Sequence, residues 1–219
     1  MELLLMANWL DTNFQGFDFA IQSAMHNLGE ATNYNISYFF RFITALAEHG
    51  YAMMALAALL IIISVVPAFR KKNPKAADTM LKMGLTAAIG MAFGLLVTNL
   101  SIKPLVARIR PYDASDLFYE WWQLARGNID LEYSFPSGHT TCTMATMTAI
   151  FIWGNKKYSW TAFIMVLLMG MSRIYFMMHY PTDVIGGIII GGVGALIGAL
   201  VVKLIYGTID KKKEKAIEV

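Results

Sequence analysis

Charged side chains are scarce in this chain of 219 residues, of which Asp, Glu, Lys and Arg together make up only 15%. A soluble domain carries about 25% charged residues, because polar groups must cover its water-facing surface. Hydrophobic residues reach 57%. The low charge therefore argues against an ordinary soluble protein and favours an integral membrane protein, and the length fits one domain.

Cysteine is nearly absent too. Because Cys142 is the single cysteine, an intramolecular disulfide and a cysteine-ligated metal cluster are both excluded. The net charge is only +3 and no basic stripe is interleaved with aromatic residues, so we expect no nucleic-acid partner. The N-terminus has neither a cationic start nor a small-residue cleavage site, and we expect no signal peptide.

Five apolar runs approach the roughly 20 residues that an α-helix needs to cross a bilayer about 30 Å thick. In chain order they are Tyr51–Phe69, Met80–Ile102, His139–Trp153, Trp160–Met178 and Val184–Tyr206. Glycines four residues apart within these runs permit close helix packing. We therefore predict an all-α fold, a polytopic membrane helix bundle with five transmembrane helices, or six if an N-terminal segment also crosses.

The N-terminal fifty residues are predicted to form short helices at the membrane surface. Leu3–Leu10 is apolar but too short to span, and Phe17–Leu28 has apolar residues at helical spacing with polar residues between them. Asn33–Asn35 should interrupt this pattern, Ile36–Ala47 should resume it, and Gly50 should precede the first span. We expect one domain over residues 1–219, divided into N-terminal helices (1–49), the bundle (50–206) and a basic tail (207–219).

Basic residues indicate the orientation of the bundle. They follow the first span, separate the third from the fourth, and follow the fifth: Arg70, Lys71, Lys72 and Lys75; Lys156 and Lys157; Lys203, Lys211, Lys212, Lys213 and Lys215. With five spans all three groups fall on one side, which the positive-inside rule makes cytoplasmic. The connection over residues 103–134 and the turn between the last two spans then face outward.

Three polar stretches lie at those outer ends, and the first is Lys103–Pro111. Lys103 and Arg110 are seven positions apart, so they lie on roughly one face of a helix that Pro111 would end. Two fixed cations fit an anion clamp, although positive flanking of a membrane helix is the alternative. Arg108 is expected to face a lipid headgroup or the interface.

The second stretch, Pro136–His139, predicts the start of a helix. Ser137 is a natural N-cap, Gly138 lets a ligand approach the backbone, and free N–H groups at a helix N-terminus attract anions. A phosphate held there would lie beside His139. Simple capping explains the same residues without a ligand.

The third stretch places Arg173, His179 and Asp183 between two long apolar runs. Each ionised group at bilayer depth costs about 2.5–3.5 kcal/mol on insertion scales. An imidazole hydrogen-bonded to a carboxylate is a better base or nucleophile, whereas a structural His–Asp pair is the alternative. Because packing alone gains nothing from three titratable groups here, the stretch indicates a site.

Taken in order, the stretches read Lys-x6-Arg-Pro, Pro-Ser-Gly-His and Ser-Arg-x5-His-x3-Asp. Together they resemble the three-part signature of the type 2 phosphatidic acid phosphatase superfamily, at every signature position. The resemblance implies a metal-independent membrane lipid phosphatase without a cofactor. The soluble vanadium haloperoxidases share the signature, but apolar spans around every motif argue against that branch.

The resemblance also implies a role for each signature residue. His179 is the expected nucleophile, forming a phosphohistidine, with Asp183 fixing its tautomer. His139 is the expected general acid and then base. The remaining signature residues would bind phosphate oxygens: Lys103, Arg110, Ser137, Gly138 and Arg173. No residue is expected to hold a metal.

The predicted partners are a lipid phosphate and the membrane lipids, in a bacterial cell membrane with the site on the extracytoplasmic side. The compact length and the start of the chain resemble undecaprenyl-diphosphate phosphatases, some of which have an acidic residue near the position of Glu48. Phosphatidylglycerophosphate or phosphatidic acid is the alternative substrate. A transporter or a non-catalytic membrane protein is the alternative of another class. The sequence leaves the oligomeric state open.

Overall fold

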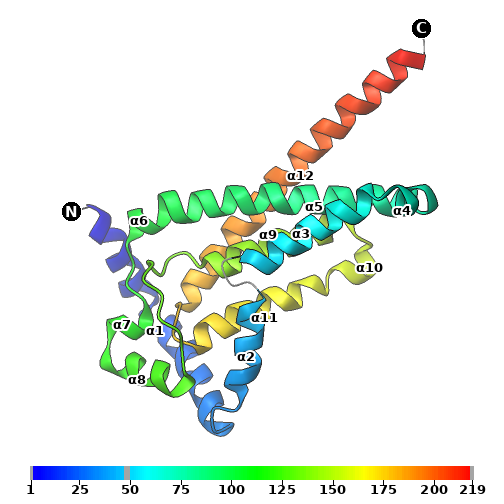
Figure 1. The fold of residues 1–219 in the computed structure, drawn as a ribbon. Coiled ribbons are helices and arrows are strands. Elements are labelled where there is room, and N and C mark those ends of the chain that lie inside the picture. The colour runs from blue at the N-terminus through cyan, green and yellow to red at the C-terminus, as the bar shows by residue number, and fades with distance from the viewer. Residues whose placement is uncertain (1, 47–49, 218–219) are drawn as a thin grey trace.

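The computed structural model describes residues 2–46 and 50–217, and every regular element in them is a helix, as predicted (Figure 1). In chain order these helices are α1 (Glu2–Ala31), α2 (Ile36–Ala45), α3 (Tyr51–Val65), α4 (Pro67–Lys72), α5 (Pro74–Leu95), a π-helical segment (Leu96–Ile102), α6 (Lys103–Val106), α7 (Pro111–Ala114), α8 (Asp116–Ala125), α9 (Gly138–Trp153), α10 (Lys156–Ser159), α11 (Ala162–Tyr175) and α12 (Pro181–Ile217).

The centre of the molecule is a three-helix contact between α5, α9 and α12, with α3 packed on α5 and α11 packed on α9. Small residues allow these helices to approach closely. Gly191 of α12 lies against the backbone of α9, where a Cβ would collide with the carbonyl oxygen of Thr141. Two threonine hydroxyls of α9 bond back to the helix: Thr143 donates to the carbonyl of His139 at 2.8 Å, and Thr146 donates to the carbonyl of Cys142 at 3.0 Å.

We expect Gly191→Ala to destabilise the bundle by about 1–3 kcal/mol, because an added methyl group in a packed interface forces the two backbones apart. The measurement is thermal unfolding of the purified protein in detergent. Gly192→Ala is the matched control, since its Cβ would meet only the Cε of Met144, at 3.6 Å. Equal unfolding temperatures for the two variants would show that close packing at Gly191 is unimportant.

Prolines shift the ends of the predicted spans. The first predicted span, Tyr51–Phe69, ends instead at Val65, because Pro67 lacks the N–H that would continue the helix. The second begins earlier than predicted, at Pro74, where proline is well tolerated in a first turn. The third agrees with α9 to within one residue.

Two helical stretches in the described residues are long and apolar enough to cross a bilayer, Pro74–Ala114 and Pro181–Thr208, and Tyr51–Val65 is a shorter apolar helix. The count of five transmembrane helices therefore stays a prediction. Large apolar side chains on the outer face of α12 are exposed, among them Ile189, Leu196 and Leu204. Such a face has no partner in the described structure and suits contact with lipid.

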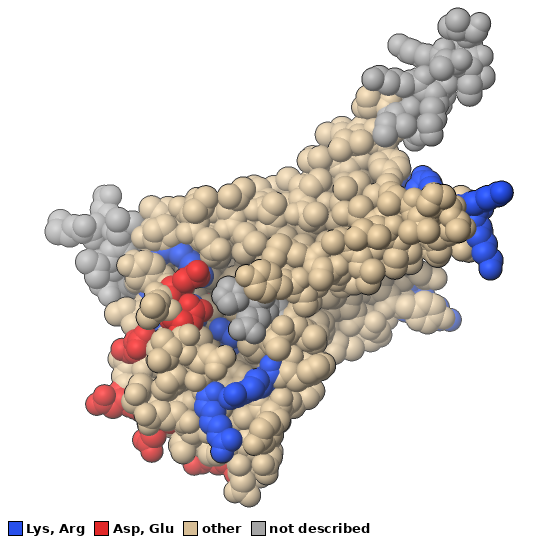
Figure 2. Space-filling view, viewed as in Figure 1, with Lys and Arg blue, Asp and Glu red and all other residues tan. Residues whose placement is uncertain are grey.

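On the face drawn in Figure 2, charged side chains lie towards two ends. Only Lys and Arg are seen at the α4 end, whereas Asp and Glu gather around α7 and α8 with further Lys and Arg beside them, and the surface between the two ends is uncharged. The basic residues of α4 and those of α10 lie at the same end of the bundle (Figure 1). Two of the three predicted basic groups thus lie at one end of the bundle, and their placement on the cytoplasmic side of a membrane stays a prediction.

The prediction for the N-terminal region is partly wrong. Instead of two short helices, one continuous helix, α1, covers Leu3–Leu10 and Phe17–Leu28, because Gly16 alone between them does not end a helix. Nor does α1 lie only at a surface, since Asp18 and Gln22 are fully buried. It packs against α8, α11 and α12.

The predicted breaks in the N-terminal region are confirmed. A turn follows α1 at residues 32–35, and Gly50 adopts a left-handed conformation with φ 74° before α3. The helix predicted over Ile36–Ala47 is α2, which ends at Ala45. Glu48 lies outside the described residues. At the other end α12 continues as helix into the predicted tail, and the division of the chain into three parts stays a prediction.

Candidate active site

The three polar stretches meet in one cavity, beside α6 and the connection to α9. The cavity has a volume of about 520 Å³, and six of the eight predicted site residues line it: Lys103, Arg110, Gly138, His139, Arg173 and His179. They come from α6, the following loop, the start of α9, the end of α11 and the loop before α12. Residues up to 76 positions apart thus share one space, as the signature predicted.

Ser137 and Asp183 lie behind the cavity wall and are fully buried. The hydroxyl of Ser137 caps α9, accepting from the Thr140 hydroxyl at 3.1 Å and from the Thr140 N–H at 3.5 Å. The predicted capping is therefore confirmed, while phosphate binding by Ser137 stays a prediction. Beside it, no atom other than those of the adjoining residues and of the helix's own backbone lies within 4 Å of the position that a Cβ on Gly138 would take, which leaves room for a ligand at the helix N-terminus.

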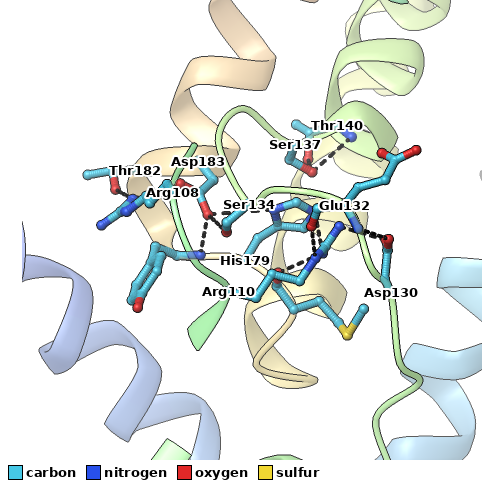
Figure 3. A network of polar contacts seen from close by, with 12 residues as sticks. Arg108, Arg110, Asp130, Glu132, Ser134, Ser137, Thr140, His179, Thr182 and Asp183 are labelled. Carbon is cyan, nitrogen blue, oxygen red and sulfur yellow. Dashed lines mark hydrogen bonds and ion pairs between the residues drawn. The ribbon is translucent and has the colours of Figure 1, made fainter. Parts of the chain in front are cut away.

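His179 is held between a carboxylate and the cavity (Figure 3). Its Nδ1 lies 3.5 Å from Oδ2 of Asp183, and its Nε2 lies 3.3 Å from Nη1 of Arg110. Oδ2 of Asp183 also accepts from the N–H of Tyr180, at 2.8 Å, and from the hydroxyl of Ser134. These contacts bind one oxygen of the carboxylate, Oδ2, beside Nδ1 of the ring. Nε2, on the other side of the ring, is the nitrogen that a ligand in the cavity can reach.

The electrostatics keep His179 uncharged. Burial lowers the pKa of its imidazole well below the usual range, and the nearby charges of Arg110, Arg173 and Lys103 lower it further. A neutral imidazole retains the lone pair that a nucleophile needs. The same three cations would attract a phosphate to the Nε2 side of the ring.

Two acidic residues of the connection before α9 form ion pairs with two of the three cations, Lys103 and Arg110. The carboxylate of Glu132 pairs with Lys103, and Oδ2 of Asp130 lies 2.6 Å from Nη2 of Arg110. Arg110 also donates to the carbonyls of Glu132, at 2.7 Å, and Met178, at 2.9 Å. A phosphate that enters the cavity must displace these two carboxylates before its own oxygens can bind Lys103 and Arg110.

Comparison with known families matches residues 79–207 to the PAP2 superfamily. The chain belongs to the PAP2 superfamily. The match includes all three polar stretches and confirms the family that the signature predicted. Within the described part of this PAP2 chain, His, Cys, Asp and Glu side chains form no group of three that could hold a metal ion.

Relatives of this PAP2 chain include several bacterial lipid phosphatases. It is 31% identical to the undecaprenyl-diphosphatase BcrC of Bacillus subtilis over 149 residues, 68% of this chain and 66% of that protein. It is 39% identical to the lipid A 4'-phosphatase of Porphyromonas gingivalis over 104 residues, 47% of this chain and 42% of that protein. The matched segments thus cover less than two thirds of either relative.

A solved structure shares the fold. The crystal structure of a transmembrane PAP2-type phosphatidylglycerolphosphate phosphatase from Bacillus subtilis aligns with a TM-score of 0.59 and 22% identity. The alignment covers 96% of this chain and 92% of that one. The all-helical arrangement, including the N-terminal helices, is therefore of the PAP2 membrane-phosphatase type.

Arg108 is the principal residue of this PAP2 site that the sequence prediction misplaced. Instead of facing lipid headgroups it is 1% exposed, and its guanidinium lies 3.8 Å from the centre of the Tyr180 ring. It contacts three carboxylates, those of Asp11, Asp18 and Asp183. The signal in the sequence was the spacing of the two aspartates on α1, seven positions apart and so on one helix face.

Proposed function

We propose that this PAP2 protein is an integral membrane phosphatase that hydrolyses a lipid phosphate or diphosphate through a phosphohistidine at His179. The observation that carries the proposal is the placement of His179, with Nδ1 facing Asp183 and Nε2 facing a cavity that Lys103, Arg110 and Arg173 also line. A neutral nucleophile among fixed cations is suited to attack on a phosphate, whose negative charge the cations compensate.

In the proposed reaction, Nε2 of His179 forms a bond to phosphorus while the bond from phosphorus to the leaving oxygen breaks. His139, which also lines the cavity, donates a proton to that oxygen. Water then attacks the phosphohistidine, His139 takes a proton from it, and the phosphorus–nitrogen bond breaks to release inorganic phosphate. Asp183 stabilises the positive charge that the imidazole acquires. Three cations supply the charge compensation that a metal ion supplies elsewhere.

We further propose that the bundle crosses the membrane five times, with the cavity at the extracytoplasmic end. The basic end, at α4 and α10, is the end that the positive-inside rule makes cytoplasmic. The cavity lies at the other end, where α7 and α8 carry the acidic residues (Figure 2). This placement would let a lipid present its headgroup to the cavity while its chains stay in the membrane.

Undecaprenyl diphosphate is the proposed substrate, which the similarity to BcrC of Bacillus subtilis supports. Phosphatidylglycerophosphate or phosphatidic acid is the alternative, and the similarity to a lipid A 4'-phosphatase adds lipid A as a further candidate. All four present a phosphate on a membrane anchor. The cavity, with a volume of about 520 Å³, is large enough for the phosphate.

The test is phosphate release by the purified protein in detergent, from each of these four lipids, with and without EDTA. We expect one lipid to be hydrolysed strongly and at the same rate in both conditions, because no step requires a divalent ion. Vanadate should inhibit, since its five-coordinate form resembles the transition state. Activity that EDTA removes would contradict the metal-free scheme. No release from any lipid would favour a transporter or a non-catalytic membrane protein.

A further inference from the structure

A carboxylate on the N-terminal helix reaches the proposed nucleophile through three connected contacts. Asp18 lies near the middle of α1, outside the family match of residues 79–207, and is 2% exposed. Its Oδ2 lies 2.8 Å from Nη2 of Arg108 and accepts the hydroxyl of Thr182 at 2.8 Å. Its Oδ1 accepts the N–H of Thr182 at 3.0 Å. Asp18 therefore binds both Arg108 and the first turn of α12.

Arg108 also binds Asp183, so it links Asp18 to the carboxylate beside His179 (Figure 3). Its Nη1 donates to Oδ1 of Asp183 at 2.6 Å and to the hydroxyl of Thr182 at 2.7 Å. Oδ1 is the carboxylate oxygen remote from His179, whose Nδ1 faces Oδ2. The sequence of contacts is thus Asp18, Arg108, Asp183 and His179.

The burial of the ion pairs between Arg108 and the carboxylates of Asp18 and Asp183 argues for a role other than stabilising the fold. A buried ion pair often adds no more stability than apolar residues of the same volume, because both charges lose their hydration. Here one guanidinium and two fully buried carboxylates are fixed by hydrogen bonds at 2.6 to 3.0 Å. What the arrangement supplies is orientation, since a bidentate guanidinium holds two carboxylates in a fixed geometry.

We propose that Asp18 and Arg108 are positioning residues for the phosphohistidine step, so that α1 completes the active site. Asp18 holds Arg108 in the orientation in which Arg108 binds Oδ1 of Asp183 and leaves Oδ2 facing the imidazole. Without the charge of Asp18, Arg108 turns towards its remaining carboxylates, and the Asp183 carboxylate rotates with it. This inference rests on the proposed function of the site.

The decisive comparison is between Asp18→Asn and Asp11→Asn. Asparagine keeps the size of aspartate and an oxygen for the Thr182 N–H, but it loses the charge. Asp11 is the matched control, since it pairs with the same guanidinium at 2.8 Å but is half exposed, at 49%. We expect Asp18→Asn to lower kcat about 10- to 100-fold with KM nearly unchanged. Asp11→Asn should alter kcat less than about twofold.

A second measurement does not depend on turnover. In protein labelled with 15N in its histidine rings, the Nδ1 proton of His179 reports the contact with Asp183. We expect its NMR signal to shift in Asp18→Asn and to stay in place in Asp11→Asn. If the wild type hydrolyses no lipid, the proposed function fails, yet this signal still tests the positioning.

Two results would overturn the proposal. One is an equal effect of the two variants on kcat and on the His179 signal. The other is a loss in Asp18→Asn that appears only as a smaller fraction of active protein, which a merely structural residue would produce. If Asp18→Asn does not fold, Arg108→Lys decides, because lysine keeps the charge but cannot bridge two carboxylates in a fixed geometry. Wild-type kcat in a folded Arg108→Lys protein would also overturn the proposal.

Discussion

Replacing His179 with alanine is expected to reduce phosphate release at least about 10⁴-fold, because the substitution removes the proposed nucleophile. His179 is the residue whose Nε2 lies beside Arg110 at the cavity wall, and alanine leaves that position without a lone pair. The measurement is inorganic phosphate released from the preferred lipid over hours, at protein concentrations high enough to detect a slow residual rate.

His26→Ala is the matched control for that variant. His26 stacks on Trp121 with ring centres 4.3 Å apart, away from the residues that line the cavity. Its loss removes an imidazole of the same size without touching the site, so activity should stay within a few fold of the wild type. Both variants should elute from a sizing column in detergent as the wild type does. Substantial hydrolysis by a folded His179→Ala protein would exclude the phosphohistidine route.

Replacing His139 with alanine should slow turnover of the lipid about 10²- to 10⁴-fold, the usual contribution of a general acid or base. The loss of rate should differ between the transfer of phosphate to His179 and the hydrolysis of the phosphohistidine. With an aryl phosphate, whose leaving group needs no proton, the first step should survive while hydrolysis of the phosphohistidine stays slow. A covalent, acid-labile phosphate should therefore accumulate on the protein.

Radioactive phosphate retained on the denatured, filtered protein measures that accumulation. The His179→Ala, His139→Ala double variant is the control, and it should retain none. If His139→Ala turns over slowly with both substrates and retains no label, His139 would not be the acid and base of the proposed scheme.

The site could be predicted largely from the sequence because each of its parts is local. Each polar stretch is read from consecutive residues, and each adjoins an apolar run that the distribution of basic loops predicts to end on the same side. The common cavity of Lys103, His139 and His179 therefore followed from the order of the spans. Ser137 likewise predicted the first turn of α9, since capping depends on residues three positions apart.

The supporting contacts could not be predicted in the same way. Asp18 and Arg108 are 90 positions apart and each stands alone among apolar neighbours, so no local pattern joins them. Glu132 and Asp130 lie in a connection without regular structure, where the sequence does not show which side chains turn towards the cavity. In both cases tertiary packing, rather than spacing along the chain, selects the partner.

The carboxylates that pair with Lys103 and Arg110 compete with phosphate for these two cations. Lys103 and Arg110 have carboxylate counterions, Glu132 and Asp130, which the oxygens of a bound phosphate would replace. Because the carboxylates are tethered, they compete at an effective concentration in the millimolar range, which free phosphate must exceed to remain bound. Inorganic phosphate formed in the cavity would thus be displaced by the chain itself, which favours release of the product after each turnover.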